Sequence, residues 1–351
     1  MKRWIAMVLT LTMLVAMTGC GGKGAVSLEP ELPPAPPVEN VEPEPEPVPF
    51  TNPLTGEVTD TDLSGNRPLA IMLNTLKKAL PQSGPGSADM LIEIPEEGGI
   101  TRIMAVFQDF SDVGNLGTVR STREYFVFMA MGLDAMLAHC GASYSANDIL
   151  SRTGYKTLNS MTMGNSFWRD DWRKKNVGLE HSLYTDSASL ETYLSDPNHI
   201  RTTHEEGFSS PYVFTEDGTP QNGQSANQIS VSFSGYKTTG FTYDATQGKY
   251  LVEAFDAPYV DDNTDQQVVV ENVVIIPTAQ STKTDGQLQE FDLTSGTGYF
   301  ACGGQYTEIR WEKGDMDAPM VFKTADGAPL ELGVGNTYIC ICGTDRPITF
   351  A

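Results

Sequence analysis

A proline-rich tract near the N-terminus is the feature that most constrains which part of this chain can form a folded domain. Nine prolines fall between residues 30 and 49, and they alternate largely with Glu and Val. Such a tract has few apolar side chains and lacks many backbone donors, so it cannot build a core. It extends as polyproline II, at about 3.1 Å per residue. We therefore predict that residues 20–49 are a flexible Pro/Glu-rich tether of about 80–90 Å.

The first twenty residues carry the features of an export signal. Lys2 and Arg3 are basic, residues 4–17 are almost wholly apolar, and small residues precede Cys20. The apolar run is short for a membrane span and typical of a signal peptide. The pattern resembles the bacterial lipobox, which predicts a signal peptide at 1–19, cleavage before Cys20 and a lipid on that cysteine. The alternatives are an ordinary secretory signal with an incidental cysteine, or an uncleaved anchor.

The charge balance limits the partners. The chain has 45 acidic and 23 basic residues, a net charge of −22, and removal of residues 1–19 takes away two of the cations. A surface this acidic repels phosphate backbones and anionic headgroups. We therefore expect no nucleic acid partner. We expect the lipid on Cys20 to hold the chain at the outer face of a bacterial cytoplasmic membrane.

Residues 50–215 combine strand and helix patterns. Gly98-Gly99 separates two β-type runs and predicts a hairpin. Ser121 and Glu124 have the spacing of a capping box, and apolar residues follow them at helical intervals. The predicted strands are 69–73, 88–94, 100–107 and 137–140, and helical segments are predicted after residue 121, at 146–152 and at 187–195.

Residues 225–351 read differently, as many short strands with glycine-containing turns between them. The fold class predicted for the chain is therefore α+β. We expect a mixed sheet with packed helices in the N-terminal part and mostly antiparallel β structure in the C-terminal part, packed as one body or as two. The C-terminal strands are predicted at 229–233, 241–244, 250–255, 268–276, 298–302, 306–311, 320–323 and 338–342.

Four cysteines remain once Cys20 is assigned to the lipid. Cys340 and Cys342 point to the same side of a predicted strand, so either could pair with Cys302 in an exported protein. Buried free thiols are the alternative, for these three and for Cys140. No Cys or His pair has the spacing of a zinc site, and we expect no metal and no cofactor.

A set of short motifs occurs in a fixed order along the chain. Together they resemble the YerB-like lipoproteins, a family defined by a domain of unknown function with N-terminal and C-terminal parts. The resemblance implies a two-part α+β architecture and a lipid anchor, and it implies no reaction. The motifs are Asn66-Arg67-Pro68, Pro81-Gln82-Ser83-Gly84, Gly98 to Arg102, Val119-Arg120-Ser121 with Arg123, Asp134-Ala135, His139, Phe167 to Asp170 and His181 to Thr185.

Two positions depart from that family pattern. His181-Ser182 stands where the family usually has His-Asn, and Tyr259 stands where a histidine is expected after the proline. The second departure argues against a catalysis that depends on that histidine.

Three arginines suggest a site for an anion. Arg102, Arg120 and Arg123 lie within 22 positions in a chain poor in basic residues, and two of them flank the predicted helix start. Guanidinium groups and helix N-termini both bind carboxylate or phosphate. The favoured hypothesis is a non-catalytic module that binds an anionic cell-envelope ligand or a partner protein through these arginines and Tyr184. The alternative is that the arginines pair with Glu93, Glu96, Glu97 or Glu124.

A second hypothesis is an envelope hydrolase or transferase. His139 and His181, with Asp134 or Asp170 nearby, are the candidate acid–base groups. A hydrogen-bonded core histidine is the more common role for such residues. Trp168 and Trp172 could stack on a sugar ring, although packing of an irregular loop onto the core is the role that we favour for them.

Overall fold

The computed structural model describes residues 48–351, which are built around one mixed sheet of eleven strands. The predicted signal peptide, the lipidated Cys20 and nearly all of the predicted tether lie outside these residues. The strands after residue 220 form one half of the sheet and those before residue 160 the other half, in the order β12-β24-β23-β20-β27-β4-β5-β3-β7-β8, with β25 paired to β24. Their bounds are β3 Leu69–Asn74, β4 Met90–Pro95, β5 Thr101–Phe107, β7 Met136–His139, β8 Leu158–Asn159, β12 Gln224–Ser225, β20 Asn272–Thr278, β23 Ser295–Cys302, β24 Gln305–Glu312, β25 Val321–Thr324 and β27 Thr337–Gly343.

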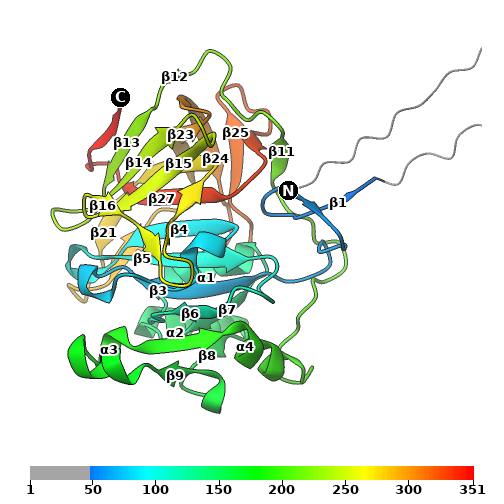
Figure 1. Cartoon of the computed structure of the whole chain (residues 1–351), viewed down its shortest axis with the longest axis vertical. Coiled ribbons are helices and arrows are strands. Elements are labelled where there is room, and N and C mark those ends of the chain that lie inside the picture. The colour runs from blue at the N-terminus through cyan, green and yellow to red at the C-terminus, as the bar shows by residue number, and fades with distance from the viewer. Residues whose placement is uncertain (1–47) are drawn as a thin grey trace, which may run out of the picture. The chain divides into compact units, whose positions relative to one another are not determined.

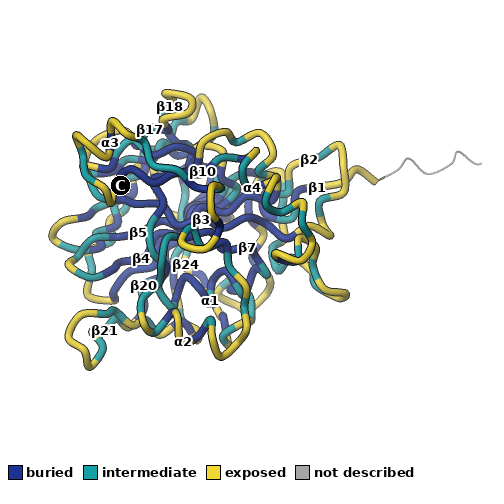
Figure 2. The backbone as a smooth tube through the Cα atoms, turned by 90° about the horizontal axis from the view of Figure 1, so that it is seen from below, coloured by how far each residue is buried: buried dark blue, intermediate teal, exposed yellow. Residues whose placement is uncertain are grey.

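The central strands are buried on both faces, as near-continuous apolar runs require. In β3 the side chains alternate, so that Ile71 faces one core and Met72 the other. Figure 2 shows the central strands as buried, with exposed loops around them.

A second sheet covers one face of the central sheet. It has the order β16-β15-β14-β13-β28, with β19 paired to β15. Its apolar side chains pack into the core that contains Ile71. A three-stranded sheet, β6-β10-β9, lies under the N-terminal part of the same face. The bounds are β13 Gln228–Ser232, β14 Thr238–Asp244, β15 Lys249–Ala254, β16 Ala257–Pro258, β19 Val269–Val270, β28 Ile348–Phe350, β6 Asn115–Gly117, β9 Trp168–Arg169 and β10 Leu183–Asp186.

Helices α1 and α2 cover the other face, and α3 and α4 flank the three-stranded sheet (Figure 1). Among the helices between residues 48 and 351, none has the length and apolar character needed to cross a membrane. The bounds are α1 Glu124–Gly132, α2 Tyr144–Thr153, α3 Asp171–Asn176 and α4 Ser187–Leu194.

The predicted capping box of α1 is wrong. The residue before the helix is Arg123, which makes no side-chain cap. The Ser121 hydroxyl donates instead to the Cys140 carbonyl at 2.7 Å, and Glu124 pairs with Lys283 at 2.7 Å. Both side chains are drawn away from the helix end by contacts that sequence spacing cannot show.

The α+β fold class is confirmed, with a mixed sheet and helices in the N-terminal part and mostly antiparallel strands in the C-terminal part. The two parts are joined where β27 pairs in parallel with β4 (Figure 1). Residues 48–351 form one compact unit. The boundary predicted between residues 215 and 225 stays a prediction, because strands on either side of it share one sheet.

A buried carboxylate reinforces this junction. Glu93 on β4 is fully buried, and it accepts hydrogen bonds from Tyr338 and Thr239, both at 2.7 Å. Lys237 lies 3.3 Å from the same carboxylate and is also buried. A buried charge without partners would be very unfavourable, and here most of the partners come from the C-terminal part.

The four later cysteines are free thiols. Cys302 enters the core on one face of the sheet, whereas Cys340 and Cys342 enter the core on the other. Strand β20 also separates β23 from β27. The alternative of buried free thiols therefore describes Cys302, Cys340 and Cys342, whereas Cys140 is free but only partly buried. The pairing of Cys302 with Cys340 or Cys342 does not occur.

We predict that the two parts do not fold separately. Residues 48–220 expressed alone would expose the fully buried strand β4 as a sheet edge and leave Glu93 without its C-terminal partners. Urea denaturation followed by tryptophan fluorescence should show one cooperative transition for residues 48–351 and none for residues 48–220. A cooperative transition of the shorter piece would contradict this account.

Candidate ligand-binding site

An aromatic-lined cleft of about 610 Å³ lies beside the three-stranded sheet. Its aromatic walls are Trp168 from β9, Trp172 from α3 and Tyr184 from β10. The charged residues that line it are Lys78, Asp170, Arg173 and Asp262. The cleft therefore combines flat apolar surfaces with polar groups, as ligand sites usually do.

Strand pairing places two of the aromatic rings. Tyr184 is directly opposite Trp168 across the β10–β9 pair, and their rings stack with centroids 6.4 Å apart. On its other side Tyr184 is opposite Gly117 of β6. A Cβ atom at Gly117 would lie 2.5 Å from the Tyr184 ring, so only glycine leaves room for it.

Helix α3 supplies the third aromatic residue. Asp170 caps this helix by accepting a hydrogen bond from the Arg173 amide at 2.6 Å. Arg173 is buried and donates to the carbonyl oxygens of Ala79 and Pro81, at 2.9 and 2.7 Å. Its guanidinium also lies 5.8 Å from the centre of the Tyr184 ring. These contacts hold α3 in place, with Trp172 on its outer side.

A loop from the C-terminal part completes the cleft. The hairpin of β17 (Val260–Asp261) and β18 (Gln266–Gln267) is fastened by Asp261, which accepts hydrogen bonds from the amides of Gly84 and Gly86. The next residue, Asp262, lines the cleft and lies 3.9 Å from Arg173. The cleft is thus formed only when both parts of the chain are present.

The exposure of Trp172 corrects the role favoured for it from sequence, whereas Trp168 is half-buried. Trp172 is 67% exposed, so it does not pack an irregular loop onto the core. The neighbouring Phe167 is buried and has that role. Burial raises the pKa of Tyr184 to about 12, so its hydroxyl stays protonated at neutral pH and can donate a hydrogen bond.

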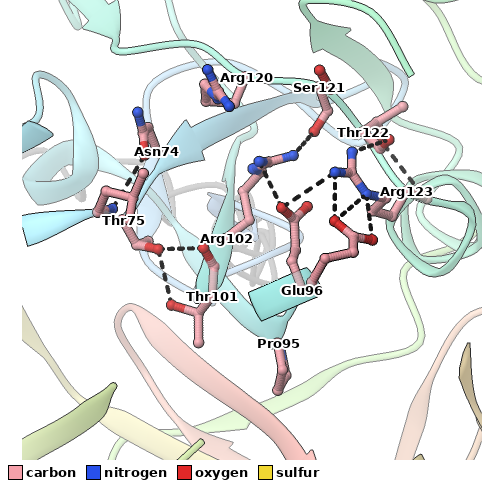
Figure 3. Close-up of polar contacts among 12 residues, drawn as sticks. Asn74, Thr75, Pro95, Glu96, Thr101, Arg102, Arg120, Ser121, Thr122 and Arg123 are labelled. Atoms are coloured by element: carbon pink, nitrogen blue, oxygen red, sulfur yellow. Dashed lines mark hydrogen bonds and ion pairs between the residues drawn. The ribbon is translucent and has the colours of Figure 1, made fainter. Parts of the chain in front are cut away.

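Arg102 and Arg123, by contrast, are paired with glutamates (Figure 3). Arg102 is buried and lies 2.6 Å from the buried carboxylate of Glu96. Arg123 binds Glu97 through two nitrogens and lies 3.7 Å from Glu96. Burial lowers the pKa of Arg102 to about 10, so it remains cationic at neutral pH. The pairing alternative describes both side chains, and neither lines the aromatic cleft.

Arg120 differs from the other two arginines. Its guanidinium donates to the backbone carbonyl of Glu180 at 3.1 Å and forms no ion pair with a carboxylate among residues 48–351. It is half-buried, and in Figure 3 it points away from the Glu96 cluster. A three-arginine anion site stays a prediction, and Arg120 is the member whose charge is least compensated.

The two histidines are held as structural residues. His139 is buried, and its Nδ1 donates to the Gly141 carbonyl while its Nε2 accepts from Thr157, both at 2.8 Å. His181 is also buried, and its Nδ1 accepts from the Asn74 amide at 2.8 Å. Burial lowers the pKa of both imidazoles, which favours the neutral form.

Asp134 meets neither histidine. It contacts Arg67, Arg201 and His204, at 3.2, 2.7 and 2.9 Å. Burial alone would raise the pKa of Asp134, but the hydrogen bonds from His204 and Arg201 lower it to about 2. The structure therefore does not bring His139, His181 and Asp134 together as acid–base groups.

Several cleft residues were not predicted from the sequence. Lys78, Arg173 and Asp262 come from three separate segments, and no local pattern links them. The signal that was present is the pair of tryptophans four positions apart, next to the motif that contains Tyr184.

Comparisons with known proteins agree with this two-part architecture. Residues 54–200 match the N-terminal domain, and residues 229–339 the C-terminal domain, of a family described as "Protein of unknown function (DUF3048)". A Bacillus subtilis (strain 168) protein named "Putative lipoprotein YerB" is 30% identical over 295 residues, which are 82% of this chain and 85% of that protein. The crystal structure of the YerB protein from Bacillus subtilis matches with a TM-score of 0.73 and 28% identity, over 86% of this chain and 99% of that one.

The fold and the matches define a two-part α+β protein of the YerB-like class. The chain belongs to the DUF3048 family. The resemblance noted in its ordered motifs is thereby confirmed.

We predict that the arginine–glutamate cluster stabilises the fold. Glu96→Gln leaves the buried Arg102 without a counter-charge, which should lower the free energy of unfolding by about 3 kcal/mol. Glu312→Gln is the matched control, because Glu312 pairs with Lys323 at the exposed surface and should cost less than about 1 kcal/mol. Urea denaturation measures both changes. Equal effects of the two substitutions would contradict a structural role for Glu96.

Proposed function

We propose that this chain is a lipid-anchored extracytoplasmic protein that binds a cell-envelope saccharide without catalysis. The anchor is supported by the sequence around Cys20 and by the name of the Bacillus subtilis relative. Binding is supported chiefly by one observation, the cleft lined by Trp168, Trp172 and Tyr184.

The chemistry of the cleft suits a sugar ring. The C–H face of a sugar is apolar and stacks on indole or phenol rings, while its hydroxyls need hydrogen-bond partners. Trp172 offers an exposed ring, and Trp168 and Tyr184 are already stacked. Asp170, Asp262 and the Tyr184 hydroxyl supply acceptors and a donor at the same place. With His139 and His181 both buried in other contacts, this arrangement favours binding over hydrolysis.

The anchor is tested by replacing Cys20. The Cys20→Ala chain should accumulate in unprocessed form and incorporate no labelled fatty acid in a bacterial host. Cys140→Ala is the control, because Cys140 is a free thiol within the folded part and should leave labelling unchanged. Normal labelling of the Cys20→Ala chain would overturn the anchor.

Binding is tested by replacing Trp172. Because its ring is exposed in the cleft, Trp172→Ala should weaken saccharide binding about tenfold or more, at about 1.5 kcal/mol per lost stacking contact, with little change in stability. Tyr144→Ala is the matched control, since Tyr144 is 61% exposed and lies outside the cleft. Isothermal titration with envelope oligosaccharides measures both. Unchanged affinity of the Trp172 variant would contradict the proposed site.

A further inference from the structure

The aromatic cleft lies in the most basic stretch of an acidic chain. Arg173, Lys174 and Lys175 follow one another in α3, and Lys78 lines the same cleft. The chain as a whole has about two acidic residues for each basic one. Cations in the last turn of a helix also interact favourably with its dipole, so the position of these residues alone does not indicate a ligand.

The partners of these charges are more informative. Asp170 is used as the cap of α3, and Asp262 lies beside the buried Arg173. Lys174 and Lys175 are exposed and form no ion pair within the described part of the chain. Lys78 is 57% exposed, and its one carboxylate partner between residues 48 and 351 is Glu180, at 3.5 Å. Lys78 is therefore an available cation at the rim of the cleft, and Lys174 and Lys175 lie on the helix that supplies Trp172.

Glu180 is the carboxylate that pairs with Lys78 at the rim of the cleft. Its side chain is 55% exposed and lies between Lys78 and the buried His181. Arg120 donates to the backbone carbonyl of the same residue. An ion pair between two exposed side chains is weak, because water screens it. Another anion can therefore replace the Glu180 carboxylate at Lys78, and this exchange also gives up the 3.0 Å contact of that carboxylate with the Nε2 of His181.

Building on the proposed saccharide site, we propose that the ligand is an acidic glycan. Its ring stacks on the aromatic residues of the cleft, and its carboxylate or phosphate takes the place of Glu180 beside Lys78. Arg120, which forms no ion pair with a carboxylate among residues 48–351, donates to the backbone carbonyl of Glu180 and extends the positive rim for the next acidic unit. This assigns Glu180 as a built-in competitor of the ligand.

The proposal is tested with two pairs of tetrasaccharides and the complete mature chain in detergent. The first pair is tetragalacturonate and its methyl ester, in which a small methyl group replaces the charge of each carboxylate. The second is a tetrasaccharide that bears a hexose 6-phosphate and its dephosphorylated form, so that carboxylate and phosphate are told apart. We expect at least one acidic form to bind about tenfold more tightly than its neutral partner, with a difference that shrinks as salt rises.

The variant Glu180→Gln gives the sharper result. It should tighten binding of the preferred acidic form about threefold to tenfold and leave binding of the neutral form unchanged. Glu205→Gln is the matched control, because Glu205 is an exposed glutamate that lies 3.7 Å from Arg201 and outside the cleft. It should change neither affinity.

The outcomes separate the two proposals. Equal binding of acidic and neutral forms, or no gain in Glu180→Gln, overturns the acidic ligand and leaves the saccharide site standing. No binding of any of the four saccharides overturns the proposed function itself. A gain in both glutamine variants would show a general charge effect and would also overturn the role of Glu180.

Discussion

The parallel pairing of β27 with β4 is the contact on which the rest of the structure depends. It joins the last long strand of the chain to a strand of the N-terminal part, so that strands from both parts form one sheet. The buried Glu93 makes this junction specific, because its hydrogen bond from Tyr338 links residues 245 positions apart. Without that partner a charge would be left in the core. The same junction brings the hairpin that carries Asp262 against the N-terminal part, and so completes the aromatic cleft.

Charge is used in two different ways in this acidic chain. Arg102 and Arg123 are matched to Glu96 and Glu97 where the β4–β5 hairpin meets α1, and they serve the fold. Beside the cleft Lys78 is exposed and its carboxylate partner within the described residues is the exposed Glu180, whereas the buried Arg173 serves the fold. Burial separates these cases, since a buried pair cannot be exchanged for a ligand without large cost, whereas an exposed pair can.

Most strands and helices were predictable, because apolar runs and glycine turns are local signals. The strands at 69–73 and 100–107 match β3 and β5 almost residue for residue. The pairing of β4 with β27 was not predictable, since neither segment carries a sequence pattern that identifies the strand it pairs with. The cleft was predictable only in part. Trp168, Trp172 and Tyr184 are near in sequence, but Lys78 and Asp262 reach the cleft through tertiary contacts. The predicted capping box at Ser121 was wrong for the same reason, because the Ser121 hydroxyl donates to the carbonyl of Cys140, which is distant in sequence.

The tryptophan indole signals test the central claim most directly. Residues 20–351 contain three tryptophans, Trp168, Trp172 and Trp311, and of these Trp168 and Trp172 line the cleft. Trp311 is buried and donates to the Thr297 carbonyl at 3.1 Å, so it serves as an internal reference. In a two-dimensional NMR titration with an acidic oligosaccharide, the indole N–H signals of Trp168 and Trp172 should shift while that of Trp311 stays fixed. Unmoved signals from both cleft tryptophans at saturating saccharide would contradict the account.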